Sequence, residues 1–253
     1  MAGDRKTIGW GRDKAGRDVR IDWETNTDRP NRGFICHQAT AWHGEDFQGF
    51  LRVAYVDRQE YKRHNPTVWN HFQNFGGMCL PSRDADPRDL RGEEAAKFFR
   101  SALHYLGFYN APAPPTYEEF ETQAKTARRY KDLMRHRKEF FEFHLDRPYV
   151  DYADVSGWDP RHFTEGAPDR RGEGVGKLLY FGTAHALADM GLPFHSSGLQ
   201  SDDAQGIWAR FGEMGLISEV PIVKDKRRLQ LNADRIPESL FSREGPIADG
   251  PSL

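Results

Sequence analysis

Hydrophobic and polar residues alternate in the first part of the chain in the way expected of strands. Residues 18–24 alternate strictly, which predicts a half-buried strand. Two further β-rich runs, 34–42 and 47–56, flank a short polar turn and predict an antiparallel hairpin. Residues 1–16 are charged and rich in glycine, and they predict a loose arm. We therefore expect an antiparallel meander that begins near residue 18.

The pattern changes to helix and loop over residues 65–145. Residues 93–106 place apolar side chains on one helical face, namely Ala96, Phe99, Leu103 and Leu106. Residues 116–144 predict one long, charged helix. We expect this middle segment to be a large helical insertion.

The last third alternates strands and helices. Residues 149–156 predict a strand, and apolar residues then recur at helical spacing from Leu178 to Leu187, before Gly191. Residues 192–197 predict a second, short strand.

A second amphipathic helix is predicted over residues 201–211, where Ser201 is a good N-cap residue. Residues 218–223 and 228–231 predict a closing hairpin. Residues 236–253 show little periodicity, and we expect a flexible tail.

A glycine-rich run precedes the first of these helices. Gly172, Gly174 and Gly176 allow tight turns and let a ligand approach the backbone closely. At a helix start, unpaired N–H groups and the positive end of the helix dipole favour phosphate. Dinucleotide-binding loops share this physics, but their glycines have a different spacing.

The arrangement Arg171-x-x-Gly174-x-Gly176 resembles the pyrophosphate loop of the GNAT acyltransferases, which bind acetyl-CoA. The order strand, glycine loop, helix, strand, helix is also the order of the GNAT core. The resemblance covers roughly residues 148–232, with a weaker match over 17–57. The loop is reached here only after residues 157–170, a longer connection than the family usually has.

The resemblance implies a single α/β (α+β) domain, 1–253, with a mixed, mostly antiparallel sheet flanked by helices and the helical insertion at 65–145. It implies acetyl-CoA or another acyl-CoA as co-substrate. The residues expected to hold its pyrophosphate are Arg171, Gly172, Gly174, Val175, Gly176 and Lys177.

Transfer of an acyl group to an amine requires removal of a proton from the amine and stabilisation of the leaving thiolate. Asp151 and Asp154 alternate along the predicted strand, so at most one faces the reaction, and Asp154 is nearer the loop. Alternatively, Asp154 only bonds to the adjacent loop. In the family a backbone N–H of this strand commonly polarises the thioester carbonyl.

The family often uses a Tyr of the last core helix as the acid, and alignment places Trp208 there. Because indole is no practical proton donor at neutral pH, the acid is left open among Ser196, Ser197, a nearby Tyr and solvent. Trp208 itself reads as a core residue.

Net charge and cysteine content narrow the range of possible partners and cellular compartments. The net charge of −2 argues against general coating of nucleic acid, although the segment 125–138 is strongly basic. Acidic residues balance that segment in part, so a solvated helix face competes with a phosphate-binding one. Cys36 and Cys79 alone imply no disulfide framework, and we expect a reducing cytoplasm. We expect no membrane span, because no sufficiently long apolar run occurs, and no metal site, because no metal-ligand spacing occurs.

We therefore expect an acyltransferase whose acceptor is an amine of a small molecule, a protein or a nucleobase. Modification of phage DNA bases is one form of the last. The alternative is a non-catalytic GNAT-like module that binds a nucleotide-type ligand or a partner protein. The sequence does not reveal the oligomeric state.

Overall fold

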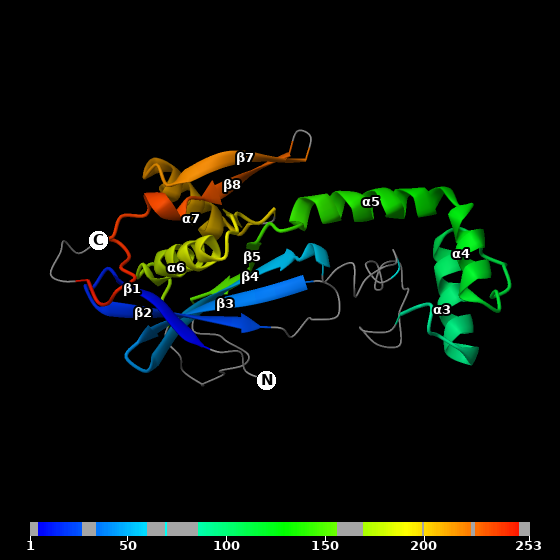
Figure 1. The fold of residues 1–253 in the computed structure, drawn as a ribbon, viewed down its shortest axis with the longest axis horizontal. Coiled ribbons are helices and arrows are strands. Elements are labelled where there is room, and N and C mark those ends of the chain that lie inside the picture. Colours follow the sequence, from blue (N-terminus) through cyan, green and yellow to red (C-terminus); the bar gives the residue numbers. More distant parts are fainter. Residues whose placement is uncertain are drawn as a thin grey trace. The chain divides into compact units, whose positions relative to one another are not determined.

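The computed structural model describes residues 5–26, 34–59, 69, 86–155, 169–198, 200–223 and 226–247 (Figure 1). The chain divides into two compact units where one domain, 1–253, was expected. The first unit comprises Met1–Asp28, Ile35–Val56 and Asp146–Leu253, and the second comprises Arg29–Phe34 and Asp57–Leu145. The second unit contains the segment 65–145.

The first unit is built on a mixed sheet of eight strands in the order β1-β2-β3-β4-β5-β6-β8-β7. The β5–β6 pairing is parallel, whereas the β1–β2, β2–β3, β4–β5, β6–β8 and β7–β8 pairings are antiparallel. The expected mixed, mostly antiparallel sheet is therefore confirmed. The strands are β1 Lys6–Arg12, β2 Asp18–Asn26, β3 Phe34–His43, β4 Asp46–Val56, β5 Tyr149–Asp154, β6 Phe194–His195, β7 Ile217–Val223 and β8 Lys226–Leu231.

Strand β1 lies where a loose arm, 1–16, was expected. Its glycines lower strand propensity but are required by packing. A Cβ atom on Gly9 would lie 2.4 Å from the Phe241 ring, and one on Gly11 would lie 2.3 Å from Leu178. The glycines therefore mark places where other elements press against the strand.

Helix α6, Val175–Asp189, packs against β1, β2 and β4 and is apolar on almost every side. A Cβ atom on Gly182 would lie 2.8 Å from Ile21 Cγ2 and 3.2 Å from Ile8 Cδ1. The missing side chain lets the helix approach the sheet closely. Helix α7, Asp202–Glu213, follows β6 and begins as predicted, because Ser201 Oγ accepts a hydrogen bond from the Ala204 N–H at 3.3 Å.

The expected flexible tail, 236–253, is ordered through Ile247. After the short 3-10 helix η3, Ala233–Arg235, the Phe241 side chain is buried in the core of the first unit. Trp10 and Ser242 exchange two backbone hydrogen bonds of 2.8 and 2.9 Å. Residues 248–253 lie outside the described part of the chain.

The described helices of the second unit are α3 Gly92–Tyr105, α4 Tyr117–Lys125 and α5 Arg128–His144. The single helix expected over 116–144 is interrupted at Thr126 and Ala127. The Thr126 hydroxyl donates to the Gln123 carbonyl at 2.7 Å. The amides of Thr126 and Ala127 donate to the carbonyls three residues earlier, as in a 3-10 turn.

Aromatic side chains form the core of the second unit. Phe99 and Phe120 stack with their ring centroids 4.7 Å apart, and Trp69 lies 5.1 Å from Phe120. No helix in the described ranges has the length and apolar character needed to cross a membrane.

The close approach of α6 gives a stability prediction. Gly182→Ala places a methyl group against Ile21 and should destabilise the protein by about 1–3 kcal/mol. Gly206→Ala on α7 is the matched control, since nothing lies within 4 Å of its added methyl group. Without a clash, alanine should stabilise that helix by up to about 1 kcal/mol. Urea unfolding measures both, and equal shifts in the two variants would contradict the packing argument.

Candidate functional site

The glycine-rich run forms a loop that leads directly into α6. Gly172 and Gly174 have φ angles of 82° and 93°, in the left-handed region that favours glycine. Gly174 is the N-cap residue and supplies no side-chain cap. The first N–H groups of α6 are therefore available to a ligand, and an anion is the ligand that the helix dipole favours.

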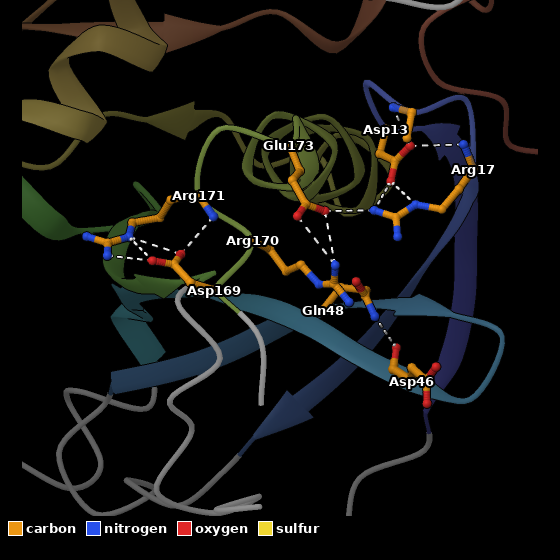
Figure 2. Close-up of polar contacts among 9 residues, drawn as sticks. Asp13, Arg17, Asp46, Gln48, Asp169, Arg170, Arg171 and Glu173 are labelled. Atoms are coloured by element: carbon orange, nitrogen blue, oxygen red, sulfur yellow. Dashed lines mark hydrogen bonds and ion pairs between the residues drawn. The ribbon is translucent and has the colours of Figure 1, made fainter. Parts of the chain in front are cut away.

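Glu173 is the acidic residue of this loop, and its carboxylate is held by arginines (Figure 2). Arg17 Nη2 lies 2.7 Å from Glu173 Oε2, and Arg170 Nη1 lies 3.3 Å from the same oxygen. Asp13 in turn accepts a 2.7 Å hydrogen bond from Arg17 Nε, and this bond is the largest cause of the raised Arg17 pKa. The negative charge of the loop is thus neutralised inside a polar network.

Backbone hydrogen bonds fasten the loop to the turn between β1 and β2 and to the end of β5. The Lys14 N–H donates to the Glu173 carbonyl at 2.9 Å, and the Arg170 N–H donates to the Val155 carbonyl at 2.8 Å. Asp13 Oδ1 accepts the N–H groups of Ala15 and Arg17, both at 2.9 Å. The turn and the loop therefore hold a fixed relative position.

A pocket of about 380 Å³, here called the basic pocket, lies beside this loop. Val155, Ile207 and Phe211 supply part of its apolar wall. Its two carboxylates, Asp202 and Asp203, are outnumbered by six cationic side chains: Arg12, Lys14, Arg170, Arg171, Lys177 and Arg210.

Three of these cations have local carboxylate partners, and Arg12 pairs with Asp18 at 3.3 Å. Arg171 pairs with Asp169 at 2.5 Å, and Arg170 pairs with Glu173. Lys177 has no ion-pair partner among the described residues. Burial lowers its pKa, and the positive charges of Lys14 and Arg210 lower it further. A bound anion would relieve this crowding of like charges.

A second pocket of about 260 Å³, here called the inner pocket, adjoins the first. Both pockets are lined by Val155, Arg171, Gly176, Asp203 and Ile207. The residues that line the inner pocket alone include Tyr152, Asp154, Tyr180, Ser201 and Ala204. A ligand that enters the basic pocket can therefore extend past Gly176 into the inner pocket.

The pairing of β5 with β6 explains why this space exists. The two strands pair only at Tyr149 and His195, after which β6 ends and β5 continues to Asp154. On its other edge, β5 stays paired with β4 up to Asp154. Since successive amides of a strand point to opposite edges, alternate N–H groups of β5 face the side on which β6 has ended.

The two aspartates of β5 have different surroundings in the structure. Asp154 lines the inner pocket, whereas Asp151 pairs with Arg52 on β4, with Arg52 Nε 2.8 Å from Asp151 Oδ2. Ser196 and Ser197 line neither pocket, and the Ser196 N–H is bonded to the Leu229 carbonyl at 2.9 Å. The two pockets therefore give no support to the expectation that one of these serines is the acid.

Of the six residues expected to hold pyrophosphate, Val175 alone lines neither pocket. Its side chain is fully buried in the core, although its N–H belongs to the first turn of α6. Sequence reasoning missed Lys14, Arg210 and Tyr180, which line the two pockets from other segments or another helical turn. The helical spacing of Gly176 and Tyr180 was the one local signal.

The basic segment 125–138 belongs to the second unit, where several of its cations have local partners. Lys125 pairs with Glu121 at 2.8 Å, and Arg135 pairs with Asp132 at 2.9 Å. Arg129 donates to the Tyr105 carbonyl at 2.6 Å. These contacts agree with a solvated, internally balanced helix face.

Within the described ranges, no group of three His, Cys, Asp or Glu side chains could hold a metal ion. Cys79 lies outside them, and Cys36 is a buried free thiol. No protein-family model matches the chain, and neither a curated protein nor a solved structure gives a significant match.

The basic pocket predicts that a small polyanion stabilises the protein. Inorganic pyrophosphate at a hundred times its Kd would add about 2.7 kcal/mol to the free energy of unfolding and should raise the Tm. Lys177→Gln should reduce this rise, whereas Lys131→Gln, which removes an exposed lysine of the second unit, should retain it. Differential scanning calorimetry measures the shifts, and equal rises in both variants would place the anion elsewhere.

Proposed function

We propose that this protein is an acyl-CoA-dependent N-acyltransferase of the GNAT type, which transfers an acetyl or other acyl group to an amine. The observation that carries the proposal is the junction of two pockets at the start of α6. One pocket is basic and lies beside a glycine loop, and the other lies where a parallel strand pair separates.

The basic pocket suits the pyrophosphate of CoA. The uncapped N–H groups of α6 would donate hydrogen bonds to its oxygens, and Lys177 would supply an unneutralised charge. Arg171 would join them at the mouth after exchanging Asp169 for phosphate. The Arg17 pair keeps the carboxylate of Glu173 from repelling the ligand.

The inner pocket suits the reacting end of the co-substrate. An N–H of β5 on the side away from β4 would polarise the thioester carbonyl. Asp154 would take a proton from the acceptor amine, whose nitrogen then attacks the carbonyl carbon. The C–N bond forms, the C–S bond breaks, and CoA leaves.

The acceptor stays open among small-molecule amines, protein amines and nucleobases. The segment 125–138 supports nucleic acid only weakly, because several of its cations are paired within the protein. The extended connection before the glycine loop, 157–170, falls largely outside the described residues.

Gly176 offers the sharpest test of the co-substrate. It lines both pockets, and an added Cβ atom would make an ordinary contact of 3.6 Å with Ile207. Gly176→Asp adds a negative charge there, whereas Gly176→Asn has nearly the same shape without the charge. Calorimetry should show that Asp weakens CoA binding about tenfold or more relative to Asn, an electrostatic loss of at least about 1.4 kcal/mol. Equal affinities for CoA in the two folded variants would show that no phosphate of CoA binds at this site.

Asp154→Asn tests the proposed base. The turnover number should fall about 10²-fold or more, with little change in CoA affinity. Asp151→Asn is the control on the same strand, since Asp151 pairs with Arg52 and does not line the pocket. A pH–rate profile of Asp154→Asn that equals that of the unaltered protein would exclude Asp154 as the base.

Tight CoA binding without turnover across a panel of amines would instead support the alternative, a non-catalytic module that binds a nucleotide-type ligand. Native mass spectrometry of the purified protein detects such a ligand directly.

A further inference from the structure

A pair of buried basic side chains lies on the sheet face away from α6 and has no part in the mechanism above. Phe194, Leu229 and Leu231 pack in the core that α6 covers. Since successive side chains of a strand alternate, His195 of β6 and Arg228 of β8 belong to the opposite face. Both are almost completely buried, with 2% and 5% of their surfaces exposed.

Strand pairing brings these two side chains together with Tyr149. His195 pairs directly with Tyr149 across β5 and β6, and the Ser196 N–H donates to the Leu229 carbonyl of β8 at 2.9 Å. The guanidinium carbon of Arg228 lies over the Tyr149 ring, 5.4 Å from its centroid. The N–H groups of a guanidinium point outward in its plane, so a hydrogen-bonding partner approaches at its edge.

His195 lies in a positive environment. Its buried Nδ1 atom makes no hydrogen bond within the described part of the chain. Burial, followed by the positive charges of Arg228 and Arg147, lowers the pKa of His195 to about 4. Burial is also the main cause that lowers the pKa of Arg228 to about 10, so this side chain stays charged at neutral pH. A bound anion would compensate for the buried positive charge.

Gly198 leaves a route to the guanidinium. It is exposed, and its φ angle lies outside the left-handed region, so the backbone does not require glycine there. A Cβ atom at this position would lie 3.6 Å from Arg228 Nη2, an ordinary contact. A side chain at residue 198 would therefore cover this nitrogen, and the glycine leaves it uncovered on that side.

Arg228 and Asp154 lie on the same face of the sheet. Ala153 is the cross-strand partner of Leu51, whose side chain is buried in the core, so the next residue, Asp154, faces away from α6. At the open edge of β5, Asp154 also borders the inner pocket. Asp154 thus lies on the β5 side of the opening between β5 and β6, and Arg228 lies on the β8 side.

We propose that Arg228 and His195 bind an anionic group of the acceptor, so that the acceptor is an amine that also carries a carboxylate or a phosphate. This inference rests on the proposed acyl transfer and names the class of its acceptor. The amine would lie at Asp154, and the anionic group would lie across the opening. Its oxygens would accept charge-assisted hydrogen bonds from the guanidinium edge. In the tautomer that carries a proton on Nδ1, His195 would donate a further bond.

The first experiment compares matched acceptors. Glycine, 4-aminobutyrate and 6-aminohexanoate are each tested against the alkylamine of the same chain length. At the length that spans the opening, the unaltered protein should prefer the carboxylate in kcat/KM by about 10- to 10²-fold, mainly through KM. Aminoalkyl phosphates of the same lengths show which anion the site takes. Equal use of amino carboxylates, aminoalkyl phosphates and alkylamines would overturn the proposal.

Three variants locate the preference. Arg228→Met keeps most of the side-chain length without the charge, and it should lower kcat/KM for the anionic acceptor to the level of the alkylamine. Arg227→Met is the matched control, because Arg227 is exposed and pairs with Glu219 at 2.9 Å, and it should retain the preference. Gly198→Val keeps Arg228 but covers its Nη2, so it should also abolish the preference, even if Arg228→Met does not fold. A preference that survives Gly198→Val and every folded Arg228 variant would place the anion elsewhere.

A binding measurement separates failure of this inference from failure of the proposed function. The Nε–H resonance of Arg228, identified by its absence in Arg228→Met, should shift when the anionic acceptors are added without acyl-CoA. Sodium chloride at the same ionic strength should not reproduce the shift. No shift, or an equal shift with chloride, would overturn the anion site whether or not CoA binds. A specific shift in a protein that does not bind CoA would uphold the anion site and overturn the proposed acyl transfer.

Discussion

The packing of α6 against the sheet is the constraint on which the site depends. Missing side chains at Gly11 and Gly182 let the helix lie close to β1 and β2, and the helix begins at Val175. The glycine loop must then reach that point from the end of β5. Both the free N–H groups and the position of Tyr180 follow from the placement of one helix.

The polar network around Glu173 complements this packing. A loop that exposes N–H groups to an anion cannot also present a carboxylate to it without repulsion. Arg17 and Arg170 neutralise the Glu173 carboxylate, while the backbone bond from Lys14 ties the loop to a neighbouring turn. The arrangement ties the loop to its neighbours and leaves the charge of Lys177 for a ligand.

Sequence patterns predicted β2, β3, β4 and α7 because each has a local periodicity that its burial explains. They failed for β1, whose glycines reflect contacts with distant residues such as Phe241. They failed also for the segment after residue 236, where burial of two apolar side chains and pairing with Trp10 create order without periodicity. The sequence pattern did not predict the break after α4, where the Thr126 hydroxyl bonds to a backbone carbonyl of the helix.

The candidate site also combines features that the sequence predicts with features that only the folded chain creates. A glycine loop at a helix start is a local feature, and its sequence predicted the local geometry correctly. The convergence of Lys14, Lys177 and Arg210 is a property of the folded chain, since these residues come from three separate elements or turns. Asp151 is paired with Arg52 of β4, whereas Asp154 lines the inner pocket, and Ser196 lines neither pocket.

The single residue pair between β5 and β6 has a consequence for the mechanics of the first unit. Strands β1–β5 and strands β6–β8 form two halves of one sheet that share little direct hydrogen bonding. A long ligand lying in the opening would touch both halves and act as a bridge between them. Such a ligand would couple their local unfolding, so that amides near the opening exchange with solvent together rather than independently.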